Sequence, residues 1–154
     1  MTTPTIYEWA GGADAFDRLT RIFYGHVHKD PLLAPVFADA ADDHPHRVAQ
    51  FLAEVFGGPA EYSERRGGHD EMARHHLGRR ITEEQRRRWV ALLMDAADEA
   101  GLPTDPEFRA VFAYYVEWGT RMAIVYSGDD PPPTDGPMPT WDWGRTPPWV
   151  PPGK

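Results

Sequence analysis

The spacing of apolar side chains between residues 6 and 127 constrains this chain more than any other feature. Apolar residues recur there at intervals of three and four positions, which places them on one face of a helix. The clearest run consists of Phe16, Leu19, Ile22, Phe23 and Val27. No segment alternates apolar and polar residues with the period of two that a half-buried strand requires. We therefore predict an all-α domain over residues 5–127.

Capping and turn residues predict where individual helices begin and end. Thr82 with Gln85 fits a capping box, and Asp105 before a proline is typical of a helix start. An Asp side chain at position 42 or 43 is likewise expected to cap the helix that follows it. Residues 60–68 are interpreted as a loop that ends in two glycines.

Composition bounds the functional classes. The chain has 154 residues, which suits one compact domain, and it has no cysteine, so disulfide and thiolate chemistry are excluded. Its formal net charge of −8 argues against broad nucleic-acid binding. No apolar stretch is long enough to span a membrane, and no secretory signal is visible, so we expect a cytoplasmic protein.

Proline marks a boundary near residue 128. Nine of the 16 prolines fall in residues 128–154, together with Trp141, Trp143 and Trp149. Such a composition cannot form a core of its own and predicts an extended segment. Because tryptophan side chains gain most when they reach a surface, we expect this Pro- and Trp-rich C-terminal extension to pack partly onto the helical domain.

Seven histidines raise the question of a metal site, and His69, His75 and His76 lie close together in the sequence. A zinc site without cysteine would have to recruit carboxylates, and no zinc-hydrolase spacing occurs. A single neutral imidazole can instead hold a haem inside an apolar slot. One helix face could wall such a slot, although such a face, taken alone, is more often plain core. It comprises His44, Val48, Phe51 and Val55.

Several short motifs occur in an order that resembles the truncated haemoglobins, most of all those of group II. They are Phe23-Tyr24, Val36-Phe37, Phe51-Leu52, Gly57-Gly58-Pro59, Tyr62-Ser63-Glu64, Arg66-Gly67, His69, His76, Arg80-Ile81 and Trp89. The resemblance covers residues 5 to about 127. It implies a fold of two helices packed over two, with haem b between the layers.

The resemblance places the proximal iron ligand at His76. The adjacent His75 creates an ambiguity of one position. We choose His76 because its spacing to both His69 and Ile81 fits the family pattern, whereas the spacing of His75 fits neither.

The same matching implies a distal side for the bound ligand. Tyr24 and Trp89 lie where the family places side chains that donate to the ligand, and a phenol O–H and an indole N–H are both donors. His44 stands where many members have a small residue. It would hydrogen-bond the ligand, act as a gate or bind iron itself.

Other side chains are implied to wall the haem or to hold its carboxylates. Arg80 is expected to pair with a haem carboxylate, with Arg74 and His75 as weaker alternatives. Group II members often have tyrosine where this chain has phenylalanine at position 37, so one possible donor is missing. The expected haem contacts are Phe37, Val48, Phe51, Leu52, Met72 and Trp89.

The resemblance implies a haem protein that reversibly binds dioxygen or another diatomic ligand, as a monomer or homodimer. Redox turnover of nitric oxide or peroxide is compatible with such a site, but it would need a separate reductase, so we assign no enzyme class. Two alternatives stay open. One is a haem-free helical interaction module that uses the C-terminal extension, and the other is a haem sensor in which the extension reports ligand state.

Overall fold

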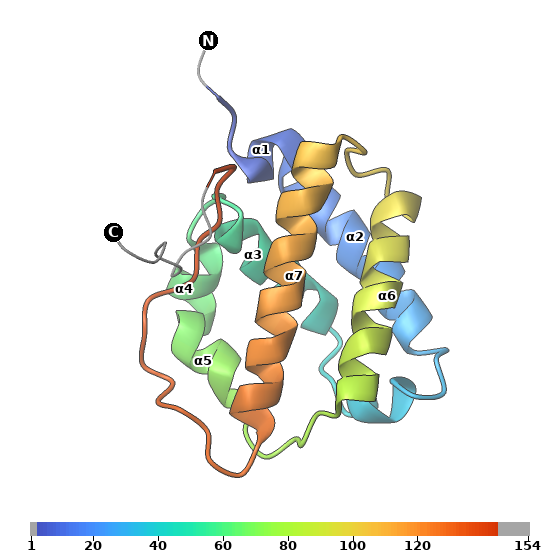
Figure 1. Cartoon of the computed structure of the whole chain (residues 1–154), viewed down its shortest axis with the longest axis vertical. Helices are drawn as coiled ribbons and strands as arrows, with labels where there is room; N and C mark the ends of the chain where they lie inside the picture. The colour runs from blue at the N-terminus through green and yellow to red at the C-terminus, as the bar shows by residue number, and fades with distance from the viewer. Residues whose placement is uncertain (1–2, 145–154) are drawn as a thin grey trace, which may run out of the picture.

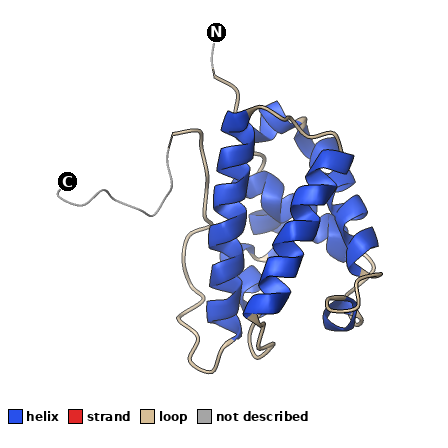
Figure 2. Cartoon of the chain, turned by 45° about the vertical axis from the view of Figure 1, so that its right-hand side comes forward, coloured by secondary structure: helices blue, strands red, loops and turns tan. Residues whose placement is uncertain are grey.

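The computed structural model describes residues 3–144, and these form seven α-helices and one 3₁₀ turn (Figure 2). In chain order they are α1 (Ile6–Ala10), α2 (Gly12–Val27), η1 (Ala34–Phe37), α3 (His44–Val55), α4 (Glu61–Arg66), α5 (Gly68–Arg74), α6 (Glu83–Glu99) and α7 (Pro106–Ser127). The prediction of an all-α domain is confirmed.

The four longest helices form two layers (Figure 1). Helices α6 and α7 lie side by side in front, whereas α2 and α3 lie behind them, and α2 packs against both α3 and α6. The short helices α4 and α5 lie beside this sandwich, next to α3 and α7. The predicted arrangement of two helices over two is confirmed.

A row of aromatic rings joins the two layers. Phe16 of α2 stacks on Phe56 at the end of α3, with ring centroids 6.0 Å apart. Phe56 stacks in turn on Phe112 of α7 at 5.8 Å, and Phe112 stacks on Phe108 at 5.7 Å. All four rings are fully buried, and each such pair adds about 0.5–1.5 kcal/mol beyond the burial of its area. The row fixes the end of α3 against α2 in its own layer and against α7 in the other layer.

The predicted caps of α6 and α7 are confirmed. The Thr82 hydroxyl accepts a hydrogen bond from the backbone N–H of Gln85 at 3.1 Å, and the Gln85 side chain accepts one from the Thr82 N–H at 2.9 Å. The Asp105 carboxylate accepts from the Phe108 N–H at 2.9 Å. Each bond satisfies a donor that the helix itself leaves free.

The expected Asp cap of α3 is wrong. Asp43 stands at the N-cap position, but its side chain caps no backbone N–H. Its carboxylate instead binds two guanidinium groups, those of Arg47 at 3.0 Å and Arg66 at 3.2 Å. A charged partner competes successfully with the backbone because charge-assisted hydrogen bonds are the stronger ones.

The interpretation of residues 60–68 as a loop is also wrong, because they contain α4 and the start of α5. A helix of six residues is too short to show a periodic pattern and is not stable alone. Tertiary contacts hold it in place. The Tyr62 ring packs edge-on against Phe51 at 5.2 Å, and the Glu54 carboxylate accepts a hydrogen bond from the Ser63 N–H at 2.9 Å.

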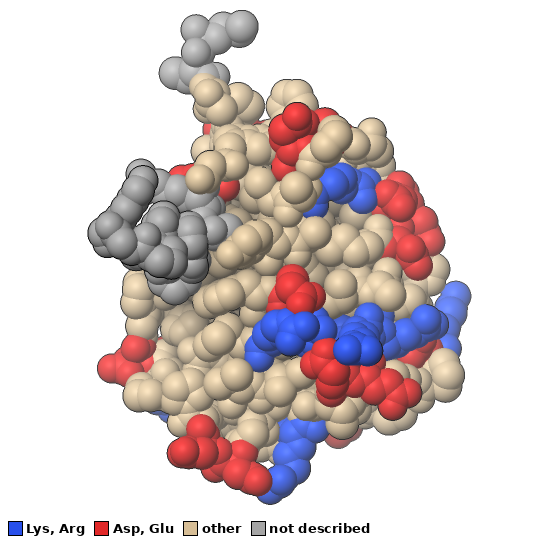
Figure 3. All heavy atoms as spheres, viewed as in Figure 1, with Lys and Arg blue, Asp and Glu red and all other residues tan. Residues whose placement is uncertain are grey.

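Charged side chains of both signs alternate on the face formed by α6 and α7 (Figure 3). Arg86 is buried there and pairs with Glu83 at 2.5 Å and with Glu117 at 2.9 Å, which ties the two helices together. Arg121 pairs with the same Glu117 at 2.5 Å. Among residues 3–144, no helix is both long and apolar enough to cross a membrane.

From the end of α7 to residue 144 the chain runs back along the helical domain without forming another helix (Figure 2). Trp141 is buried in this segment and Trp143 is half-buried, so the described part of the C-terminal extension packs onto the domain. Trp149 lies outside the described residues.

Two glycines offer a matched test of the packing. An added Cβ at Gly58 would lie 2.8 Å from the Ala53 carbonyl oxygen and 2.7 Å from the Tyr7 ring, whereas at Gly25 nothing lies within 4 Å. We expect Gly58→Ala to lower the free energy of unfolding by about 2 kcal/mol, because a backbone carbonyl cannot move aside. Gly25→Ala should raise it by about 0.5–1 kcal/mol, since alanine is the better helix former. Urea unfolding measures both, and a Gly58→Ala protein as stable as the parent would contradict this packing.

Candidate functional site

Three elements bring a cluster of aromatic side chains together at one end of the sandwich. Tyr24 comes from α2, Phe37 from η1 and His44 from the first residue of α3. The Tyr24 ring centroid lies 5.5 Å from that of Phe37 and 4.9 Å from that of His44, and the Phe37 and His44 rings are 5.8 Å apart. Three residues predicted to face the distal side of a haem thus lie in mutual contact.

Hydrogen bonds link the polar members of this cluster. His44 Nε2 lies 3.1 Å from the Tyr24 hydroxyl. The Trp89 side chain of α6 offsets part of the rise that burial causes in the pKa of Tyr24, and because an indole has only an N–H to offer, it can act there only as a donor. Burial raises the pKa of the Tyr24 phenol, so the hydroxyl keeps its proton and remains a donor. That proton can point to His44 or to a ligand placed between them.

The His44 imidazole is neutral at ordinary pH. Burial is the main cause that lowers its pKa to about 4, and the positive charges of His75, Arg47 and Arg79 contribute, while Asp43 opposes them. Arg47 of α3 and His75, which follows α5, line one cavity, so the segment following α5 lies near α3.

The geometry of His76 is that of a metal-ready imidazole. Its Nδ1 lies 2.9 Å from the Met72 carbonyl oxygen, and since a carbonyl only accepts, Nδ1 carries the proton. Nε2 then presents its lone pair. Burial lowers the pKa of His76, which favours the neutral ring that a metal requires. By contrast, the neighbouring His75 is more exposed, and its Nε2 lies 2.8 Å from a Glu71 carboxylate oxygen.

The end of α5 explains why His76 finds this partner. The helix ends at Arg74, and His76 lies in the turn that follows. The last four carbonyls of any helix have no partner within it, and Met72 is one of these. The ring of His76 takes up this free acceptor, which fixes both its tautomer and its orientation.

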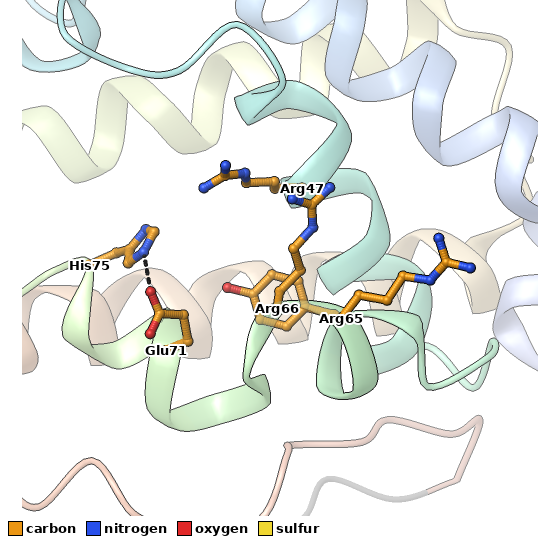
Figure 4. A pocket seen from close by; sticks show the side chains of 6 residues that line it. Arg47, Arg65, Arg66, Glu71 and His75 are labelled. Carbon is orange, nitrogen blue, oxygen red and sulfur yellow. Dashed lines mark hydrogen bonds and ion pairs between the residues drawn. The ribbon is translucent and has the colours of Figure 1, made fainter.

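A basic cavity of about 220 Å³ opens between α3, α4 and α5 (Figure 4). Its lining consists of Arg47, Tyr62, Arg65, Arg66, Glu71 and His75. The sequence analysis missed the three arginines as site residues. Arg47 could have been found, because it stands one helical turn after His44 on α3. The contribution of α4 could not, because that helix was not predicted.

The predicted carboxylate partner Arg80 does not line this cavity. Its side chain is exposed and pairs with Asp129 at 2.6 Å. Arg74 is also outside the lining, where it binds Asp70 at 2.8 Å. Only His75, one of the weaker alternatives, borders the cavity.

The remaining predicted haem contacts are apolar and partly or fully buried. Phe51 and Leu52 are buried in α3, while Val48 of α3 and Met72 of α5 are half-buried and pack against the core. Trp89 packs edge-on against Phe23 at 4.8 Å. These side chains give the site the water-excluding surroundings that a porphyrin needs.

Comparison with known proteins identifies the family. The model of the bacterial-like globins matches residues 5–112 of the chain. The chain belongs to this family. The group 2 truncated hemoglobin YjbI of Bacillus subtilis is 34% identical over 91 residues, which are 59% of this globin and 68% of the relative. As predicted, this globin is a group II truncated haemoglobin and binds haem b.

Solved structures also place this globin among the truncated haemoglobins. The group II truncated haemoglobin from Bacillus anthracis is 26% identical with a TM-score of 0.72, and the match covers 86% of this globin and 96% of that chain. The truncated oxygen-avid haemoglobin from Bacillus subtilis is 30% identical with a TM-score of 0.70, covering 79% of this globin and 99% of that chain. The two matches cover 96% and 99% of those structures, whereas 14% and 21% of this globin lie outside them.

The depressed pKa of His44 predicts a specific acid sensitivity. Between pH 6.5 and about 4 the unfolded chain takes up a proton at this position that the folded chain refuses, so stability is lost as the pH falls. From pH 7 to pH 5 the free energy of unfolding should fall by about 1 kcal/mol more in the parent than in His44→Gln, a figure reduced for partial solvent contact. Urea unfolding of both haem-loaded proteins measures this, and equal losses would show that His44 is not desolvated.

Proposed function

We propose that this globin reversibly binds dioxygen, or another diatomic ligand, at a haem whose iron is coordinated by His76 Nε2. The observation that carries the proposal is the hydrogen bond from His76 Nδ1 to the Met72 carbonyl. It fixes the protonated nitrogen and leaves the other one free, which is how proteins prepare a histidine for a metal. Dioxygen is preferred because a relative of 30% identity is an oxygen-avid haemoglobin.

The basic cavity is the proposed seat of the haem carboxylates. The guanidinium groups of Arg47 and Arg66 border it, and within residues 3–144 they pair with a single carboxylate, that of Asp43. A guanidinium pairs well with a carboxylate, and the Tyr62 hydroxyl adds a further donor. We therefore assign to Arg47, Arg66 and Tyr62 the role that the sequence suggested for Arg80.

The distal cluster supports ligand retention. Haem supplies a ferrous iron that takes up a diatomic ligand and transfers partial negative charge to it. Tyr24 and Trp89 are the donors that can stabilise this charge, while His44 competes for the Tyr24 proton at 3.1 Å. This hydrogen bond favours the role of His44 as a gate or hydrogen-bonding partner over direct ligation of iron. Turnover of nitric oxide or peroxide at the same site would draw electrons from a separate reductase.

Substitution of the two adjacent histidines tests the proximal assignment. We expect His76→Gly to weaken haem retention at least about tenfold and to lose the five-coordinate ferrous spectrum, because iron loses its protein ligand. Added imidazole should restore that spectrum. His75→Leu is the matched control and should keep it.

The opposite pattern in the two variants would move the ligand to His75. A parent protein with no Soret absorption after haem is supplied would instead favour a haem-free interaction module that uses the C-terminal extension.

Removal of the distal donor tests the ligand side. Tyr24→Phe should speed dioxygen dissociation about ten- to a hundredfold, because one hydrogen bond to a charged acceptor in a dry site is worth roughly 1–3 kcal/mol. Stopped-flow ligand displacement measures the rate. Tyr115→Phe removes the hydroxyl of another buried tyrosine, outside the distal cluster, and should leave the rate unchanged. Equal rates in the Tyr24→Phe protein and the parent would mean that Tyr24 never donates to the ligand.

A further inference from the structure

Residues 128–144, called the strap from here on, run from the end of α7 past α5 and α4 to the opposite end of the molecule (Figure 1). Trp141 anchors the strap, since its side chain is only 3% exposed. Its backbone N–H donates to the Val55 carbonyl at the end of α3 at 2.8 Å. Its ring packs on Tyr115 and Trp118 of α7, with centroids 5.0 and 5.2 Å away. The far end of the strap is therefore attached to both layers.

A second tryptophan extends this attachment to the beginning of the chain. The Trp143 indole N–H donates to the Pro4 carbonyl at 2.7 Å. Its ring lies edge-on to that of Trp9 in α1, at 6.3 Å. The far end of the strap is thus attached by two aromatic side chains and two hydrogen bonds. Its near end continues from α7, so the middle part is fixed at both ends.

That middle part lies on α5. The Thr134 hydroxyl donates to the carboxylate of Asp70, which is the third residue of α5. At Gly136 the backbone passes so close that a Cβ there would lie 3.6 Å from the His69 ring. Asp129 pairs with Arg80, but both side chains are exposed, so this pair contributes little. The strap therefore holds α5 mainly through Thr134 and by covering His69.

Helix α5 depends on such support. It has seven residues and lacks a side-chain cap. Its N-cap residue Gly67 and its first residue Gly68 both have positive φ, at 93° and 65°. A helix of this length is not stable by itself. Besides the strap, its links to the rest of the domain include the contact of His69 Nε2 with the Tyr126 hydroxyl at 3.1 Å and the packing of Met72 against the core. His76 lies two residues beyond the end of this helix.

We infer that the strap is a positioning element for the proximal histidine, in which Thr134 and Trp141 fix α5 and thereby the distance and tilt of His76 relative to the haem. The inference rests on the proposed role of His76. The strap also bonds to Val55 at the end of α3, which serves as its anchor, and its effect on His76 is transmitted mainly through α5. Thr134 and Asp70 are accordingly positioning residues.

Two full-length, haem-loaded variants test this inference against a matched control. Thr134→Val removes the hydroxyl that binds Asp70 and keeps the shape of the side chain, and Trp141→Ala releases the anchor. Thr140→Val makes the same change at an exposed threonine of the strap. The readouts are hydrogen exchange of the α5 amides and the iron–histidine stretching frequency of the ferrous protein, measured by resonance Raman spectroscopy.

We expect Thr134→Val to speed exchange in α5 about tenfold and to shift the iron–histidine frequency, because α5 loses a charge-assisted hydrogen bond. Trp141→Ala should do the same to a greater extent, and Thr140→Val should do neither. Unchanged exchange and frequency in Thr134→Val would overturn the inference, and this variant decides alone if Trp141→Ala does not fold. If His76 is not the ligand, the iron–histidine band persists in His76→Gly, while the exchange result for the strap still stands.

Discussion

The hydrogen bond between His76 and the free carbonyl of Met72 is the interaction on which the site depends. The end of a helix leaves carbonyl groups without a partner, and here one of them selects a single tautomer of the imidazole. The neighbouring imidazole of His75 has a carboxylate partner and more solvent around it, so the two adjacent histidines become chemically different. A choice that the sequence leaves ambiguous by one position is thereby made by the backbone.

The two sides of the site differ in charge. On the proposed distal side, burial keeps Tyr24 protonated and His44 neutral, so these two side chains carry no net charge. In the basic cavity, by contrast, positive charge is concentrated on Arg47, Arg65 and Arg66, although the formal net charge of the chain is −8. A flat cofactor with an apolar body and two carboxylates matches this division, because each part of it meets surroundings of its own polarity.

The long helices and their caps could be predicted from sequence because the signals are local. The capping box of Thr82 and Gln85 lies within one turn, and the apolar face of α2 repeats over several turns. The failures are non-local. The Asp43 side chain binds Arg66, which is 23 residues away, and does not cap α3. Helix α4 is stabilised by the packing of Tyr62 on Phe51 and by the hydrogen bond from Ser63 to Glu54. Tyr24 and His44, which the family resemblance places on the distal side, lie within hydrogen-bond distance of each other. The arginines of the cavity were missed because they depend on α4.

The bond between Trp143 and Pro4 has a consequence for the order in which the molecule folds. Its two partners stand 139 residues apart in the sequence. Contacts between such distant parts of a chain form slowly, since the whole intervening loop must be closed first. The helical layers, whose contacts join residues closer together in the sequence, therefore form before the bond between Trp143 and Pro4 closes.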